Sequence, residues 1–338
     1  YATSKFLGIK VISELPGERR AGALVLMILL AELALVLFGL LPAGWGAMAM
    51  FLNGLSLGMV WGTVFGFLEG RRSSDLLGAA LCASFIVASG VAKSAGQLVL
   101  GAGISERWMP AAVGLGFLPA VLGFAWMLSN VPPPSAEDEA ERVRRAPMTA
   151  AERRAFLRAY APGLFALVLL YVGLTAVRDF RDSFAREIWD ALGYRDVPTI
   201  LATSEIPVAV AALLAVVLLM FVRSSRLALL LIHGVLALGL AVAAVATLSF
   251  QAGLISPAAW MITLGAGIYV AYVPYNCVLF DRLIAASGSV ATAGFLIYVA
   301  DSFGYLGSVA LLLYKNLGQS SLPWVDFLAG SALVLGAA

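Results

Sequence analysis

Six charged residues lie inside long apolar stretches of this sequence, where they could bind a solute or an ion. They are Lys5, Lys93, Arg178, Asp179, Glu205 and Asp301, and Glu32 is a weaker case. A charge at the centre of a bilayer costs roughly 2.5–3.5 kcal/mol on insertion scales, so such residues are retained where they pair or line a water-filled cavity. Some of these charges are expected to form structural pairs and others to contact a solute. The sequence leaves that division open for each residue.

Polar and aromatic residues recur around these charges at helical spacing, on one face of each of four segments. The faces are Ser89, Lys93, Gly96 and Gln97; Tyr171, Thr175, Arg178 and Asp182; Tyr269, Tyr272 and Asn276; and Gly294, Tyr298, Asp301, Ser302 and Tyr305. A buried seam between helices would also be polar, but it would seldom gather so many ionisable groups. We therefore predict a substrate site formed by Lys5, Lys93, Gln97, Tyr171, Arg178, Tyr269, Tyr272, Asn276, Tyr298, Asp301 and Tyr305.

The depth of a charged residue within its apolar segment indicates whether it belongs to the solute site near the midplane or to a gate near the membrane surface. Lys5 lies about ten residues from the end of its segment, or about 15 Å at 1.5 Å per residue, which is near the midplane of a bilayer. Arg178 and Glu205 fall nearer the outer surface, on segments that follow one another in sequence. We predict that these two residues form an ion pair that gates the site.

The composition excludes several classes of protein. Apolar residues make up 61% of the chain and charged residues 12%, so water is not its main solvent. No basic run is interleaved with aromatic residues, which argues against nucleic acid as a partner. Two cysteines and one histidine offer no metal-ligand spacing and are too few for a disulfide framework. We expect no metal, no cofactor and no enzymatic activity.

Eleven apolar segments are long enough, or nearly so, to cross a bilayer core of about 30 Å. Five precede the polar stretch Asn130–Tyr160: Tyr1–Leu15, Gly22–Leu41, Trp45–Leu68, Leu76–Leu100 and Met109–Leu128. Six follow it: Ala161–Ala185, Pro198–Val222, Leu227–Phe250, Ile255–Leu283, Val290–Leu313 and Leu322–Ala338. Within the polar stretch, Thr149 and Glu152 have the spacing of a capping box that opens a surface helix.

Basic residues alternate between the two ends of these segments. The linker side carries Arg19, Arg20, Arg71, Arg72, Arg142, Arg144, Arg145, Arg153, Arg154, Arg158, Arg223, Arg226 and Arg282, and the other side carries only Arg107, Arg186, Arg195 and Lys315. Because cytoplasmic loops are enriched in Lys and Arg, the linker is predicted to be cytoplasmic. The alternation also supports the number of segments.

An internal repeat relates the two halves. VAKSAGQL (Val91–Leu98) and VADSFGYL (Val299–Leu306) share five of eight positions and carry a charge at the same place. The repeat predicts two homologous six-helix bundles, with the first helix of the N-terminal bundle absent and the last helix cut short. The predicted domains are an N-terminal bundle at residues 1–129 (helices 2–6), a cytoplasmic linker at 130–157 and a C-terminal bundle at 158–338 (helices 7–12). Glycines recur every four residues in the third predicted segment and just beyond it, at Gly54, Gly58, Gly62, Gly66 and Gly70. This spacing predicts a flat helix face against which another helix can pack closely.

This layout resembles the major facilitator superfamily, in which sites lie between two six-helix halves. YATSKFLG (Tyr1–Gly8) and AGFLIYVADSFGYLG (Ala293–Gly307) resemble the second and eleventh helices of its organophosphate:phosphate antiporter branch. GLSLGMVWG resembles the glycine-rich fourth helix of the superfamily, and SKFLGIKVISELP resembles an uncharacterised bacterial family of the same kind. ELPGERR is similar to the gating loop after the second helix and keeps Arg19 and Arg20, although the usual Asp-Arg is missing.

The resemblance implies an all-α transporter of the bacterial cytoplasmic membrane, multi-pass and monomeric. The predicted function is secondary active transport of a small organic solute, most simply an anion held by Lys5 and Lys93. Asp301 would pair with a lysine or carry a proton, and H⁺ or phosphate would be the coupling ion. No ATP-binding loop of the Walker type is present. The alternatives are a sensor or receptor that kept a transporter fold, and a membrane-embedded enzyme acting on lipid-linked substrates.

Overall fold

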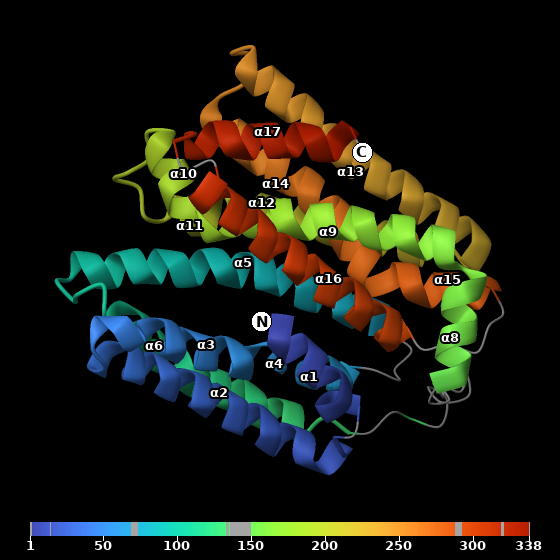
Figure 1. The fold of residues 1–338 in the computed structure, drawn as a ribbon, viewed down its shortest axis with the longest axis horizontal. Helices are drawn as coiled ribbons and strands as arrows, with labels where there is room; N and C mark the ends of the chain where they lie inside the picture. The colour runs from blue at the N-terminus through green and yellow to red at the C-terminus, as the bar shows by residue number, and fades with distance from the viewer. Residues whose placement is uncertain are drawn as a thin grey trace. The chain divides into compact units, whose positions relative to one another are not determined.

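A computed structural model describes residues 2–13, 15–68, 74–132, 135, 150–287, 293–318 and 321–337. Within these ranges the regular structure is helical and no strand occurs (Figure 1). The helices before the polar stretch are α1 (Ala2–Ser13), α2 (Gly17–Leu40), η1 (Ala43–Trp45), α3 (Gly46–Leu57), α4 (Val60–Leu68), α5 (Ser74–Gly101) and α6 (Met109–Ser129). After it come α8 (Ala150–Ala159), α9 (Ala161–Ser183), α10 (Ala185–Ala191), α11 (Ile200–Thr203), α12 (Glu205–Met220) and α13 (Ser225–Gln251). The chain continues with α14 (Pro257–Pro274), the π-helix η2 (Tyr275–Leu279), α15 (Phe280–Ser287), α16 (Ala293–Leu313), the π-helix η3 (Tyr314–Gly318) and α17 (Trp324–Ala337).

Nine helical spans among the described residues are long and apolar enough to cross a membrane. They are Gly17–Leu40, Gly46–Leu68, Leu76–Gly101, Met109–Ser129, Ala161–Ser183, Ile200–Met220, Ser225–Gln251, Pro257–Ser287 and Leu296–Gly318. The shortest has 21 residues, which spans about 30 Å of hydrocarbon. The shorter helices α1 and α17 lie where the first and last predicted segments were placed. The chain is therefore a multi-pass α-helical membrane protein, as its composition predicted.

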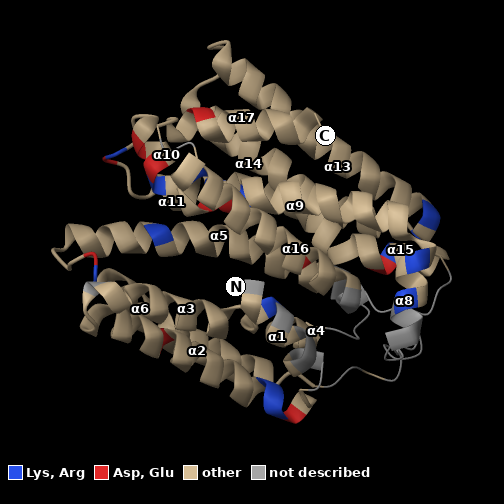
Figure 2. Ribbon diagram, in the orientation of Figure 1, with Lys and Arg blue, Asp and Glu red and all other residues tan. Residues whose placement is uncertain are grey.

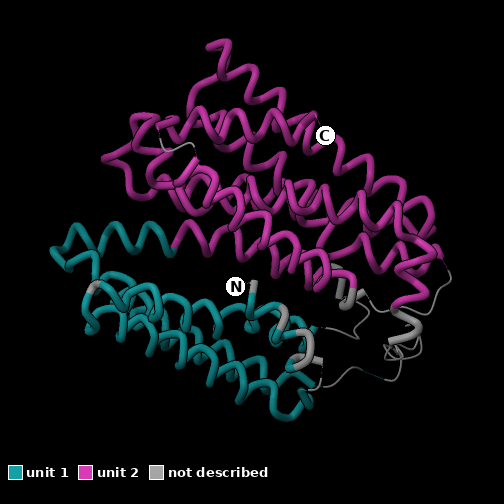
Figure 3. The backbone as a smooth tube through the Cα atoms, viewed as in Figure 1, with its two compact units in different colours: residues 1–74, 92–143 teal, residues 75–91, 144–338 magenta. Residues whose placement is uncertain are grey.

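The chain divides into two compact units (Figure 3). Unit 1 contains residues 1–74 and 92–143, and unit 2 contains residues 75–91 and 144–338. Residues 75–91 belong to unit 2, although the predicted N-terminal bundle of residues 1–129 includes them. The reason is the apolar face of α5, whose Ala79, Cys82, Ala83 and Ile86 are buried in the core of unit 2.

In unit 1, α2 packs against α3, α4 and α6. Glu32 on α2 is 9% exposed and lies against Gly114 of α6, where a Cβ atom would collide with its carboxylate. The predicted glycine face makes two close contacts. A Cβ at Gly58 would lie 2.5 Å from the side chain of Ser4, and one at Gly66 would lie 3.2 Å from the guanidinium of Arg20. The packing role is thus confirmed at these two positions, while Gly70 lies outside the described residues.

In unit 2, α14 is the central helix. The span that contains it is 78% buried, whereas no other span exceeds 39%. Helices α9, α12, α13, α16 and α17 and the first part of α5 supply most of the rest of the core. The crossing of α13 and α14 is close, because Gly239 and Gly267 face one another. A Cβ at Gly239 would lie 2.5 Å from the carbonyl oxygen of Gly267, and one at Gly267 would lie 2.6 Å from that of Gly239.

Gly239→Ala should therefore destabilise unit 2 by about 1–3 kcal/mol, the usual cost of overpacking a tight contact. Gly234→Ala, on the same helix, is the matched control, because nothing lies within 4 Å of the added Cβ. At that open helical position alanine should be neutral or stabilise by roughly 0.5–1 kcal/mol. Denaturant unfolding in detergent micelles compares the two variants. Equal stabilities would show that the α13–α14 crossing tolerates separation.

Short connections fix the order of these helices. After α13, Gly253 takes a φ of 71°. Its N–H donates to the carbonyl of Phe250 at 2.9 Å, and the next N–H, of Leu254, donates to Ser249 at 2.9 Å. This pattern closes a helix at a left-handed glycine. Two residues later Ser256 caps α14 by accepting from the N–H of Ala259 at 3.2 Å. The chain therefore reverses within five residues, Ala252–Ser256, and α14 packs against α13.

A proline interrupts the central span. Pro274 has no N–H to give to the carbonyl one turn earlier, so an α-helix is weakened there. The backbone continues as the π-helix η2, whose wider turn is rare and often occurs at functional sites. Tyr275, Asn276 and Cys277 lie in this turn, and all three are buried.

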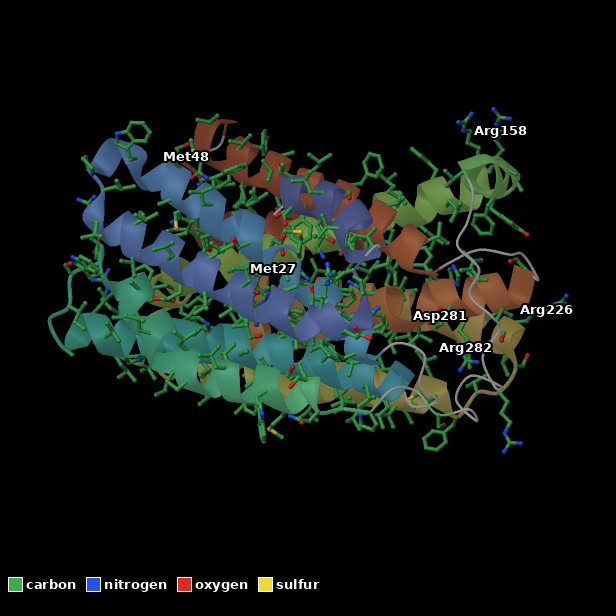
Figure 4. All side chains as sticks on the ribbon, turned by 90° about the horizontal axis from the view of Figure 1, so that it is seen from below. Met27, Met48, Arg158, Arg226, Asp281 and Arg282 are labelled. Carbon is green, nitrogen blue, oxygen red and sulfur yellow. The ribbon has the colours of Figure 1, made fainter. Side chains whose placement is uncertain are left out.

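Charged residues of unit 2 gather mainly at the ends of its helices (Figure 2). Arg158, Arg226 and Arg282 lie at the same end (Figure 4), whereas α10 and α11 lie at the other (Figure 1). The sequence placed these three arginines on one side, and the structure places them at one end of unit 2, as predicted. Helix α8 begins at Ala150, directly after Thr149 of the predicted capping box. Thr149 itself lies outside the described residues, as do Arg71, Arg72, Arg142, Arg144 and Arg145.

Candidate functional site

Four buried polar side chains form a hydrogen-bonded network inside unit 2, which we call the Asp301 network. They are Tyr171 on α9, Tyr272 on α14, Asn276 in η2 and Asp301 on α16. The Tyr171 hydroxyl donates to Asp301 Oδ1 at 2.5 Å, and the hydroxyl oxygens of Tyr171 and Tyr272 are 3.0 Å apart. Asn276 Nδ2 lies 3.0 Å from the Tyr171 hydroxyl and 3.2 Å from that of Tyr272. Each side chain belongs to a residue less than 10% exposed.

Counting protons gives this network a direction. Tyr171 has one hydroxyl proton, which it gives to the carboxylate of Asp301. The bond between the two tyrosines must then be donated by Tyr272. The two N–H groups of Asn276 serve both hydroxyl oxygens. The amide oxygen could not take their place, because the protons of both tyrosines are already donated. The chain of donors therefore runs from Tyr272 through Tyr171 and ends at Asp301 Oδ1, which accepts.

Three buried oxygen atoms beside this network have no hydrogen-bond partner among the described residues. They are Asn276 Oδ1, Thr175 Oγ1 and Ser302 Oγ. Thr175 lies one turn beyond Tyr171 on α9, and a Cβ at Gly304 of α16 would approach both of these residues to 2.9 Å. Buried polar groups are normally satisfied, so these oxygens indicate places where water, an ion or a solute completes the site.

Arg178 connects the Asp301 network to a second polar group. Its guanidinium carbon lies 4.1 Å from the centre of the Tyr272 ring, and it forms an ion pair with Asp179. The side chains of this pair are 13% and 17% exposed, so neither is fully buried. One turn further along α9, Asp182 lies 3.5 Å from the Tyr269 hydroxyl and 3.4 Å from the Ser89 hydroxyl of α5. The positive charge of Arg178 therefore has the carboxylate of Asp179 close to it.

The predicted gate pair is different in this structure. Glu205 pairs with Arg181 rather than with Arg178: Arg181 Nη2 lies 2.8 Å from Glu205 Oε1 and Nη1 lies 3.2 Å from Oε2. The side chains are 2% and 7% exposed. Arg181 is three residues beyond Arg178, almost one helical turn, so it reaches the start of α12 while Arg178 stays over Tyr272.

Unit 1 contains the remaining predicted cations. Lys5 on α1 is 4% exposed, and its Nζ lies 5.3 Å from the centre of the Trp61 ring. Lys93 and Gln97 are half-buried on the last part of α5. Of the predicted gating arginines, Arg19 is exposed, and Arg20 donates to the carbonyl of Gly66 at 2.5 Å. Arg20 thus holds the start of α2 against α4.

The structure brings together five of the predicted residues, Tyr171, Arg178, Tyr272, Asn276 and Asp301, with Tyr269 close by through Asp182. Tyr298 and Tyr305 are half-buried on α16. Sequence reasoning missed Arg181, although its spacing of seven residues from Leu174, about two helical turns, places it on the same side of α9 as that buried residue. It also missed Lys315, which is 2% exposed and lies 4.3 Å from the centre of the Trp324 ring.

These groups define a class of site. Within the described residues no three His, Cys, Asp or Glu side chains gather as metal ligands. The site instead combines a carboxylate, hydroxyls, an amide and a guanidinium in the interior of a membrane-spanning bundle. Such groups can bind a polar solute and hold or release a proton. The protein is a multi-pass membrane protein with an ionisable network in its spans.

The whole chain, residues 1–338, matches the family of unknown function DUF5690, and it belongs to that family. A comparison with curated proteins gives no match.

Proposed function

We propose that this protein is a secondary active transporter that moves a small organic solute, most simply an anion, by alternating access. The observation that carries the proposal is the Asp301 network with Arg178 above Tyr272, buried within helices that span a membrane. Ionisable groups in spans are costly, and they are characteristic of solute and ion pathways. A bundle that only needed to pack would use apolar side chains at these positions.

The helices that carry the network support movement. Pro274 and the π-helix η2 weaken the central span next to Asn276. Kinks at prolines and π-bulges are places where a helix can bend. Binding of a solute to Tyr272 or Asn276 would therefore act on the part of the span that bends most easily.

Arg178 is the proposed contact for the acidic group of the solute. A planar guanidinium binds carboxylates and phosphates through two parallel hydrogen bonds. Asp179 occupies part of this fork in the structure, so the solute would compete with it. The half-exposed aromatic surfaces of Tyr298 and Tyr305 offer contact for the rest of the molecule. That Lys5 and Lys93 bind the solute stays a prediction.

Reconstituted vesicles test this proposal. We expect uptake of at least one organic anion by vesicles that contain the protein, and at least a tenfold loss with Arg178→Gln. A lost charge-assisted bond of about 1.5–3 kcal/mol gives a change of this order. Arg186→Gln is the control, because Arg186 forms a partly exposed i,i+4 pair with Asp190. It should retain uptake.

Three results would contradict the proposal. Absence of flux for any solute that binds would favour a sensor that kept a transporter fold. Equal uptake by the Arg178 and Arg186 variants would remove Arg178 from the site. Transport of cations alone would exclude an anionic solute.

A further inference from the structure

The two cysteines of this chain meet inside unit 2, although 195 residues separate them in sequence. Cys82 Sγ on α5 lies 3.2 Å from Cys277 Sγ in η2, and both are buried thiols that are not joined by a disulfide. The chain has only two cysteines among 338 residues, so two scattered thiols would not be expected to touch. Two cysteines are too few for a disulfide framework, but they are enough for a single disulfide.

We propose that Cys82 and Cys277 are a dithiol–disulfide redox couple that fastens α5 to η2 when oxidised. A disulfide has a sulfur–sulfur bond of about 2.05 Å, so the two atoms need to approach by roughly 1 Å. Ala79 and Ala83, beside Cys82 on α5, have small side chains that do not obstruct the approach of Cys277. The π-helical turn around Cys277 is a place where a helix can bend, so a small adjustment there is inexpensive.

A peroxide is the oxidant of suitable chemistry, because it is small and uncharged and can enter an apolar interior. The first thiol is oxidised to a sulfenic acid, and the peroxide is reduced with release of one water or alcohol. The second thiol then attacks the sulfenic sulfur, forms the sulfur–sulfur bond and releases one water. In total the two thiols lose two electrons and two protons to the peroxide. A small thiol reductant reverses the reaction by exchange.

The consequence rests on the proposed transport function. The same stretch of α5 is held at two further points, since Ser89 contacts Asp182 and a Cβ at Gly90 would collide with the carbonyl of Leu201. These two contacts are reversible, whereas a disulfide at Cys82 is not without reductant. Because η2 is the turn at which the central span bends most easily, fastening it to α5 should arrest transport.

Crosslinking of the full chain tests the couple directly. A protease site inserted within residues 136–149 lies between the two cysteines in sequence. After treatment with hydrogen peroxide, alkylation of free thiols and cleavage, we expect the two fragments of the otherwise unaltered protein to migrate together without reductant. They should separate after reduction. Cys82→Ala and Cys277→Ala each keep one thiol and should give separate fragments under all conditions. Separate fragments from the oxidised protein with both cysteines would overturn the proposal, as would joined fragments from either variant.

Thermal unfolding gives a second readout that does not depend on transport. The oxidised protein should melt several degrees higher than the reduced protein, because the disulfide closes a long loop in the unfolded chain. Neither cysteine variant should show this shift. An unchanged melting temperature in a fully crosslinked sample would show that α5 and η2 do not part on unfolding, which would contradict a fastening role.

Solute flux then separates the two proposals. Peroxide should reduce flux at least tenfold in the protein with both cysteines, reversibly, and leave the Cys82→Ala variant unaffected. Equal flux before and after complete crosslinking would overturn the arrest. Absence of flux in the reduced protein would overturn the transport function, while the crosslinking and melting results would still decide the redox couple.

Discussion

Arg181→Met should lower the free energy of unfolding by about 3–5 kcal/mol, because it leaves Glu205 as an uncompensated buried charge. The two side chains are 2% and 7% exposed, and Arg181 also donates to the carbonyl of Met261 at 3.2 Å. The guanidinium fits beside α14 only because Gly265 has no side chain, since a Cβ there would lie 2.6 Å from Nη2. Denaturant titration in detergent micelles, followed by circular dichroism, measures the loss.

The double variant Arg181→Met with Glu205→Leu should be more stable than either single variant. Apolar residues of similar size often replace a buried pair at little cost, so the effects of the single changes should not add. Arg186→Met is the matched control. Its i,i+4 pair with Asp190 is 25% and 24% exposed, and such pairs contribute about 0.3–0.5 kcal/mol. Strict additivity in the cycle would show that Arg181 and Glu205 do not depend on one another.

Asp301→Asn should abolish accumulation of solute against a gradient while leaving exchange of solute across the vesicle membrane measurable. An asparagine resembles a protonated carboxyl, so it fixes the Asp301 network in one state. The hydroxyl of Tyr171 would lose its charged acceptor, and Tyr272 and Asn276 could then reorient. If Asp301 carries the coupling proton, driven uptake falls at least tenfold, whereas passive exchange does not require the proton to leave.

Asp326→Asn is the control for this change, because Asp326 is exposed in the first turn of α17. It should keep both driven uptake and exchange. Loss of exchange together with uptake in Asp301→Asn, at unchanged stability, would instead place Asp301 in direct contact with the solute. Full driven uptake in that variant would remove Asp301 from the coupling mechanism.

Membrane spans were predictable because the bilayer imposes a length and an apolar composition on each of them. The segments Gly22–Leu41 and Met109–Leu128 differ from α2 and α6 only at their ends. The sequence did not reveal that the predicted segment Trp45–Leu68 is divided at Gly58 and Met59 into α3 and α4. It also did not reveal that the predicted segment Ile255–Leu283 contains the π-helix η2. Hydropathy does not report such local changes in helix type, although Pro274 lies directly before the second of them.

The site was predictable as a set of helical faces but not as a set of partners. Spacing correctly put Tyr171, Tyr272, Asn276 and Asp301 on polar faces, and the structure joins these four residues through hydrogen bonds. Partner identity depends on how each helix is rotated about its axis. The predicted partner of Glu205 was Arg178, but the actual partner is Arg181, which lies three residues further along α9. The repeat suggested that Lys93 and Asp301 are equivalent, and that equivalence stays a prediction.

Continuity of α5 limits which changes of length the chain can accept. This helix of 28 residues carries Cys82 and Ser89 in unit 2 and Lys93 and Gln97 in unit 1. Inserting or deleting a single residue between Cys82 and Ser89 would rotate Ser89 by about 100° relative to Cys82. Cys82 contacts Cys277 and Ser89 contacts Asp182, so these two contacts within unit 2 could no longer form at the same time. A surface turn such as Ala252–Ser256 carries no such constraint, so insertions should be accepted there and rejected in the middle of α5.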